Sequence, residues 1–71
     1  MANSMEYLIG STAGQIWEYL VINGSVTSLK MKSVLGIPNS LLYLALGWLA
    51  REDKIEIAET GHTYKITLKT K

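Results

Sequence analysis

Residues 39–57, NSLLYLALGWLAREDKIEI, change their hydrophobic period without an intervening loop. Apolar residues first recur once per helical turn, and after Asp53 they alternate with polar residues, as they do in a half-buried strand. This pattern predicts a helix over residues 40–52, with Asn39 as its N-cap, that leads directly into a strand. Four residues on one side of that helix are predicted to face the core: Leu42, Ala45, Leu46 and Leu49.

The chain that follows this helix has the pattern of a β-hairpin. Apolar residues alternate with polar or small ones over residues 55–58 and again over residues 64–69. Between the two stretches, Gly61-His62 fits a two-residue type II′ turn, which requires glycine in its first position. Counting outward from the turn predicts two apolar pairs across the hairpin, Ile57 with Ile66 and Ile55 with Leu68.

Upstream, a first helix is predicted over about residues 5–22. Asn3 or Ser4 offers its N-cap, while Thr12 offers an alternative and later start. Asn23-Gly24 ends the helix, because both residues tolerate the left-handed conformation of a C-cap. The apolar residues of this stretch recur at helical spacing: Ile9, Ala13, Ile16, Trp17 and Leu20.

A second helix, of irregular or slightly extended form, is predicted to begin at Thr27 or Ser28 and to end at Gly36. The connector before it, residues 25–27, is short and β-branched, which suits a brief edge strand. The turn after it contains Pro38, which disfavours helix at the residue before it. A helix, a short glycine-containing turn and a second helix are typical of the helix-turn-helix motif.

In chain order the predicted elements are a helix, a short strand, two helices and a hairpin, and this is the order of a winged helix-turn-helix domain. The sequence therefore predicts an α+β fold in which a three-helix core carries the C-terminal hairpin as its wing. No linker, repeat or low-complexity tract interrupts it, so residues 1–71 are predicted to form a single domain.

The local sequence narrows this interpretation. Residues 45–55, ALGWLAREDKI, resemble a motif of a small bacterial and archaeal family of stand-alone winged helix-turn-helix domains. Parts of the first predicted helix resemble the same family: Ile9-Gly10, Ala13-Gly14, Ile16-Trp17 and Leu20. The resemblance implies the fold over nearly the whole chain. It implies DNA binding only by analogy with other winged helices.

Composition limits the function classes. The chain of 71 residues has no cysteine, is 48% hydrophobic and has a formal net charge of +1, so it lacks the basic surplus of most nucleic-acid-binding domains. The N-terminus lacks the pattern of a signal peptide. The longest apolar run, residues 41–50, is far shorter than the roughly 20 residues that span a bilayer. We therefore expect a cytoplasmic protein without a membrane partner.

Nothing in the sequence points to an enzyme, a metal, a cofactor or a small-molecule substrate. His62 is the only histidine, and it lies at the predicted hairpin tip, where it is either a solvated turn residue or a contact to a phosphate or partner. Glu52 and Asp53 are adjacent, but neighbours on a helix point about 100° apart, which argues against a shared catalytic site. No glycine-rich phosphate loop with its lysine is present.

Binding is then decided by the outward side of the helix over residues 40–52. The predicted contacts to double-stranded DNA are Ser40, Tyr43, Gly47 and Arg51 on that helix, with Lys30, Lys32 and Lys65 along a phosphate-contacting rim. Lys54, Lys69 and Lys71 would extend this rim, although scattered lysines also serve simply to solvate a surface. These residues offer few side chains that can recognise bases, since Arg51 lies far from the first turns of the helix, from which base contacts usually come.

The same helix has three candidates for contact with a protein: Leu41, Leu44 and Trp48. Leu41 and Trp48 flank the core side and can pack within the monomer, whereas Leu44 lies almost opposite that side. Exposed apolar clusters usually mark interfaces. Two hypotheses follow. The first is a DNA-binding winged helix, a small transcriptional regulator or accessory factor that binds as a dimer. The second is a winged helix that serves as a protein-interaction or dimerisation module without nucleic acid.

Overall fold

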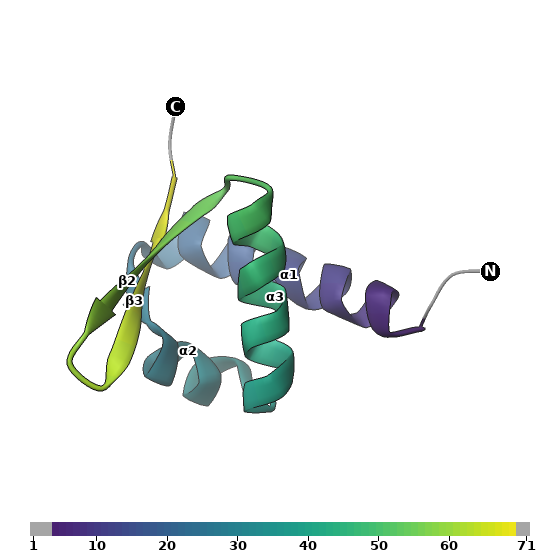
Figure 1. Ribbon diagram of the computed structural model, residues 1–71, viewed down its shortest axis with the longest axis horizontal. Helices are drawn as coiled ribbons and strands as arrows, with labels where there is room; N and C mark the ends of the chain where they lie inside the picture. Colours follow the sequence, from purple (N-terminus) through teal and green to yellow (C-terminus); the bar gives the residue numbers. More distant parts are fainter. Residues whose placement is uncertain (1–3, 70–71) are drawn as a thin grey trace.

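The computed structural model describes residues 4–69, which form three helices and one three-stranded antiparallel sheet of strand order β1-β3-β2 (Figure 1). The elements are α1 (Ser4–Asn23), β1 (Val26–Thr27), α2 (Ser28–Leu35), α3 (Asn39–Arg51), β2 (Ile55–Thr60) and β3 (Thr63–Leu68). This is the predicted order, and the α+β winged helix-turn-helix fold is confirmed.

Helix α1 covers the whole of the predicted first helix. It is already helical at Ser4, so Ser4 is not its N-cap and the alternative start at Thr12 is wrong. Asn3, the other proposed N-cap, lies outside the described residues. The buried residues of α1 are Thr12, Ala13, Ile16 and Leu20, whereas Trp17 is exposed.

Helix α2 is a regular helix, contrary to the irregular form expected from its sequence. Thr27 is its N-cap: the Thr27 side-chain oxygen accepts a hydrogen bond from the Lys30 amide at 3.1 Å. Gly36 adopts the left-handed conformation at the C-cap (φ 63°), and its N–H donates to the Lys32 carbonyl. Met31 is the one large apolar side chain of α2 that is fully buried, which explains why no clear apolar stripe is visible in this segment.

Helix α3 buries the four predicted core residues, Leu42, Ala45, Leu46 and Leu49. The prediction for its N-cap is wrong. The helix begins at Asn39 itself, and Pro38 occupies the cap position in an extended conformation without a side-chain hydrogen bond. The Pro38 carbonyl accepts the first intrahelical hydrogen bond, from the Leu42 amide at 2.9 Å, as the carbonyl of an N-cap residue does. The axes of α2 and α3 meet at 117°, within the range of helix-turn-helix motifs.

The chain reverses between α3 and β2 within three residues. Asp53 has a left-handed backbone conformation (φ 63°), the one such non-glycine residue in the described part of the chain. The Lys54 amide donates to the Leu49 carbonyl and the Asp53 amide to the Ala50 carbonyl, each at 3.0 Å. These two bonds form a Schellman motif with aspartate in the position that glycine usually takes. Strand β2 therefore starts as soon as the helix ends.

The hairpin has the predicted register. Ile57 is paired with Ile66 and Ile55 with Leu68, and Gly61 has the positive φ (61°) that the first position of a type II′ turn requires. On its other side β3 pairs with β1, through Val26 with Ile66 and Thr27 with Lys65. Strand β3 is thus the central strand, which explains why its Ile66 is fully buried.

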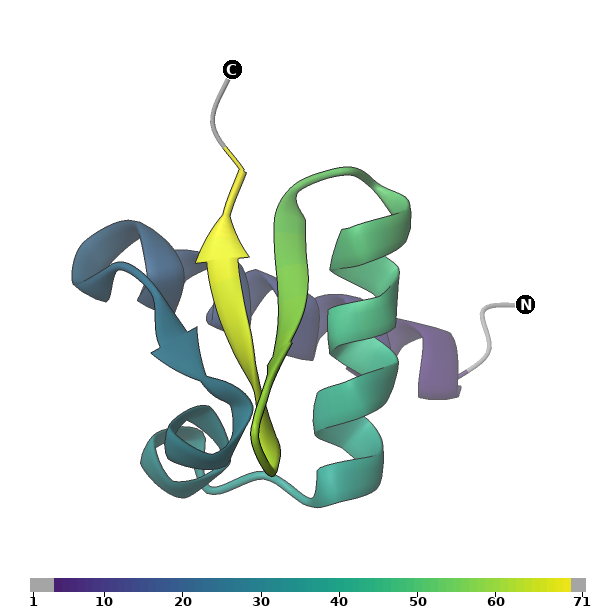
Figure 2. The same ribbon diagram turned by 60° about the vertical axis from the view of Figure 1, so that its left-hand side comes forward.

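The core lies where α1, α3 and the inner face of the sheet meet (Figure 2). Its ten buried apolar residues are Ala13, Ile16, Leu20, Met31, Leu42, Ala45, Leu46, Leu49, Ile55 and Ile66. In the described part of the chain no single helix is both long and apolar enough to cross a membrane; α2 and α3 pass such a test only as a bent pair, by length and composition.

Asp53→Gly is expected to raise the free energy of unfolding by about 0.5–1 kcal/mol, because glycine adopts the left-handed conformation without a steric cost. The substitution also removes the ion pair of Asp53 with Lys69, which is solvent-exposed and contributes little. Lys69→Gln removes the same ion pair and retains Asp53, so it serves as the control and should leave stability nearly unchanged. Chemical denaturation measures both. A loss of stability in Asp53→Gly would show that the carboxylate, and not the backbone, holds the reversal.

Candidate nucleic-acid interface

The position of the hairpin tip follows from the lengths of two elements. The 13 residues of α3 span about 20 Å at 1.5 Å each, and the six residues of β2 span about 20 Å at 3.3 Å each. Because β2 runs back along α3 from the reversal at Asp53, the hairpin tip returns to the level at which α3 begins. Figure 2 shows the tip beside α2 and the start of α3, at the lower end of the molecule.

The hairpin tip is fastened to α2 by a buried hydroxyl. Ser28, the first residue of α2, is 1% exposed, and its Oγ lies 2.8 Å from Oγ1 of Thr63. The Tyr64 amide and the Tyr43 hydroxyl both donate to the Ser28 Oγ, each at 3.3 Å. One side chain thus joins α2, α3 and the hairpin.

A count of donors and acceptors assigns the protons of this cluster. The Ser28 oxygen has two lone pairs, and Tyr43 and Tyr64 occupy both, so the Ser28 hydroxyl donates to the Thr63 oxygen. Thr63 also accepts the Leu29 amide at 3.3 Å, which uses its second lone pair. The hydroxyl proton of Thr63 is then free to donate to a ligand.

A cleft of about 540 Å³, the α2–hairpin cleft, opens beside this cluster. It is lined by Ser28, Leu29, Lys32, Asn39, Tyr43, His62 and Thr63. The lysine ammonium, the asparagine amide and the threonine hydroxyl are hydrogen-bond donors, and no carboxylate is among the described residues that line the cleft. A wall of donors without an acid is suited to an anion.

Three of the predicted DNA contacts lie at or near this cleft. Lys32 and Tyr43 line it, and Ser40 is exposed in the first turn of α3. The Tyr43 ring meets the Tyr64 ring edge to face, with centroids 6.0 Å apart. This contact orients the Tyr43 hydroxyl toward α2 and holds α3 against the hairpin. Lys30 is exposed on α2, two residues before Lys32.

The other two predicted contacts on α3 lie on a different side of the helix. Gly47 and Arg51 line a second hollow, the α1–α3 groove, whose volume is about 450 Å³. All its lining residues come from α1, α3 and the turn after α3: Ile9, Leu44, Gly47, Trp48, Arg51 and Glu52. The predicted DNA contacts of α3 are therefore divided between two surfaces. Leu41 is half-buried, and Leu44 and Trp48 are 48% and 38% exposed.

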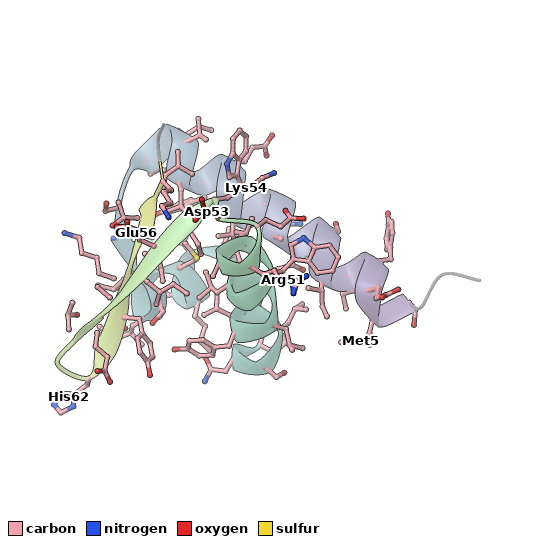
Figure 3. All side chains as sticks on the ribbon, turned by 45° about the horizontal axis from the view of Figure 1, so that its top comes forward. Met5, Arg51, Asp53, Lys54, Glu56 and His62 are labelled. Atoms are coloured by element: carbon pink, nitrogen blue, oxygen red, sulfur yellow. The ribbon has the colours of Figure 1, made fainter. Side chains whose placement is uncertain are left out.

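The predicted lysine rim is divided in the same way. Lys54 lies 3.8 Å from a Glu52 carboxylate oxygen, and Lys69 forms an ion pair with Asp53, whose hydrogen bond raises the pKa of Lys69. Figure 3 shows Asp53 and Lys54 at the end of the hairpin opposite to His62. These two lysines are thus paired and far from the α2–hairpin cleft. Lys65 lies in the middle of β3, opposite Thr27, and Lys71 lies outside the described residues.

The net charge of +1 conceals an uneven distribution along the chain. All six acidic residues lie outside residues 19–51: Glu6, Glu18, Glu52, Asp53, Glu56 and Glu59. The helix-turn-helix segment over residues 28–51 contains Lys30, Lys32 and Arg51 and no acid, which gives three positive charges minus none, or +3. Glu59, paired across the hairpin with Tyr64, is the acid nearest to the hairpin tip along the chain.

Sequence reasoning did not identify three of these residues. Ser28 and Asn39 were interpreted only as helix caps, and Thr63 was not singled out. The equal lengths of the predicted helix and strand would have placed the hairpin tip beside the start of the second helix. The absence of acids between Glu18 and Glu52 was also visible in the sequence, but the net charge of the whole chain does not reveal how its charges are distributed. In the described part of the chain no three metal-ligating side chains come together.

The fold defines a winged helix-turn-helix domain. The family described as winged helix-turn-helix domain (DUF2582) matches residues 1–68, and the chain belongs to this family. It is similar to the uncharacterized protein MJ1608 of Methanocaldococcus jannaschii, with 36% identity over 64 residues that cover 86% of this chain and 90% of that protein. No solved structure gives a significant match. The predicted family resemblance is thereby confirmed.

Ser28→Ala is expected to lower the free energy of unfolding by about 1–3 kcal/mol, because it leaves the Tyr64 amide and the Tyr43 hydroxyl without an acceptor. The control is Ser33→Ala, which removes the same hydroxyl from an exposed position of α2. Urea denaturation of both variants checks the difference, and amide exchange at residues 61–64 should accelerate only in Ser28→Ala. Equal stability of the two variants would show that the buried hydroxyl does not hold the tip.

Proposed function

We propose that this domain binds double-stranded DNA through the end of the molecule where α2, the start of α3 and the hairpin tip meet. The observation that carries this proposal is the acid-free helix-turn-helix segment, whose Lys32 lies at a cleft lined with hydrogen-bond donors. Phosphate contacts supply most of the affinity of DNA-binding domains, and they need donors and positive charge without nearby carboxylates. Helix-turn-helix domains approach DNA with the N-terminal part of the second helix of the motif, here α3.

The individual contacts follow from the geometry of this end. Lys30 and Lys32 would neutralise phosphates, and the free Thr63 proton and the Asn39 amide would donate to phosphate oxygens. Ser40, exposed in the first turn of α3, would reach the bases or the backbone. Such a domain acts by binding, as winged helices typically do, and not by catalysis. A role as a transcriptional regulator or accessory factor would place it in the cytoplasm.

Contact with a protein in place of DNA is a second candidate function. The observation in its favour is the exposure of Leu44, which lies with Trp48 along the α1–α3 groove. Chemical-shift mapping separates the two candidates, since they use different sides of α3. Addition of duplex should perturb the amides of Lys32, Tyr43 and His62 and leave those of Ile9 and Trp48 in the groove unchanged.

The double variant Lys30→Gln/Lys32→Gln is expected to bind mixed-sequence duplex several-fold more weakly at low salt. The slope of log K against log[salt] should become shallower by about 0.9 for each phosphate contact that is lost. Fluorescence anisotropy with a labelled duplex, over a series of salt concentrations, measures both quantities.

The matched control is Lys54→Gln/Lys69→Gln, which removes two charges at the opposite end of the hairpin. It should bind as the wild type does. Two outcomes contradict the proposal: no salt-dependent binding by the wild type, or equal losses in the two double variants, which would indicate a non-specific attraction without a defined surface.

A further inference from the structure

The apolar side of α1 continues beyond the part that α3 covers. Leu8 and Ile9 lie one helical turn before the buried Thr12 and Ala13, and so on the same side of the helix. Leu8 is nevertheless 44% exposed. Figure 1 shows the N-terminal turns of α1 projecting past α3. The helix therefore presents core-type side chains where this copy of the chain has nothing to bury them.

The α1–α3 groove lies beside these projecting turns. Leu44 and Trp48, one turn apart on α3, form one wall, and Ile9 forms the other. Between them Gly47 lines the groove with bare backbone: apart from its two chain neighbours, no described side chain lies within 4 Å of the position that a Cβ would take there. An apolar side chain from outside can thus reach the backbone of α3.

We propose that a second copy of this chain occupies the groove, in a two-fold symmetric dimer that buries the projecting turns of α1. A two-fold interface requires a surface that is complementary to itself. This surface meets that requirement because it carries both a half-exposed apolar side chain, Leu44, and a groove that is open at Gly47.

The charges of this surface also select a second copy over a strongly acidic or basic partner. Arg51 and Glu52 line the groove, but Glu52 is already paired with Lys54. Glu6 lies one turn before Gly10 on the α1 side that faces α3. Within the described residues neither Arg51 nor Glu6 has an oppositely charged group within 4.0 Å. Another copy supplies one charge of each sign, and a net charge of +1 gives little repulsion between copies.

The size of the molecule allows such an interface. A standard interface buries about 800 Å² on each partner, roughly a sixth of the 4892 Å² surface of this chain. A long side of a molecule of 39 × 28 × 20 Å offers that area. The α2–hairpin cleft lies on the other side of α3 and stays free, so the dimer does not depend on the proposed DNA binding.

Leu44→Asp tests this proposal by sedimentation equilibrium without DNA. The wild type is expected to approach twice the mass of one chain, and the variant to dissociate with a dissociation constant about tenfold higher or more while its circular dichroism spectrum is retained. The matched control is Leu29→Asp, the same substitution at a 70% exposed residue of α2, which should remain dimeric.

A second variant keeps the test decisive if Leu44→Asp does not fold. Gly47→Gln fills the groove from α3 with a polar side chain that has free space in the monomer and a better helix propensity than glycine. It should be monomeric and at least as stable as the wild type under monomeric conditions. A wild type that stays monomeric at all concentrations overturns the proposal, as does dissociation of Leu29→Asp with both groove variants remaining dimeric.

Discussion

The three-residue reversal between α3 and β2 is the constraint on which the rest of this structure depends. Asp53 adopts a left-handed conformation and closes a Schellman motif, so the chain leaves the helix and enters the strand without a loop. Ile55 therefore begins β2 already buried in the core. Because β2 and α3 have nearly the same length, the reversal also fixes the height of the hairpin tip. A longer connection would free the hairpin to move outward, and the contact of Thr63 with Ser28 would be lost.

This arrangement divides α3 into three sides with different chemistry. One side, from Leu42 to Leu49, is buried in the core. The side facing the hairpin carries Tyr43, whose hydroxyl and ring are both engaged by neighbouring elements. The side facing α1 is apolar around Leu44 and ends at Arg51. A helix of 13 residues can thus serve a polar contact and an apolar contact at the same time, because neither contact covers the other. The two candidate surfaces drawn from the sequence thus lie on different sides of one helix, so occupation of one does not block the other.

The sequence was sufficient wherever structure is set by local pattern. The change of period at Asp53 and the turn at Gly61-His62 gave the order of elements and the hairpin register, since strand pairing is determined by counting from a tight turn. The sequence was insufficient wherever two elements meet. Helical periodicity gives the direction of a side chain around the helix axis, but it does not give the neighbouring element that the side chain faces. Tyr43 and Arg51 were therefore grouped as one surface, and the role of Ser28, which depends on contacts from two other elements, was not visible. Asn39 was wrongly assigned as a cap because the helix begins one residue earlier than its side-chain chemistry predicts, with Pro38 in the cap position.

The chemistry of the α2–hairpin cleft also defines the kind of DNA binding that we propose. Its donors are an ammonium, an amide and a hydroxyl, and the arginine that would read guanine most readily lies in the other hollow. Contacts of this type position a protein on the backbone but carry little sequence information. Specificity would then have to come from the shape of the duplex or from the spacing of two domains held together. A dimer that leaves both clefts free supplies such a spacing, and it also raises the effective affinity of two individually weak phosphate-binding surfaces. The small number of polar side chains on α3 thus suits a dimer, in which the spacing of the two copies determines the DNA site that is bound.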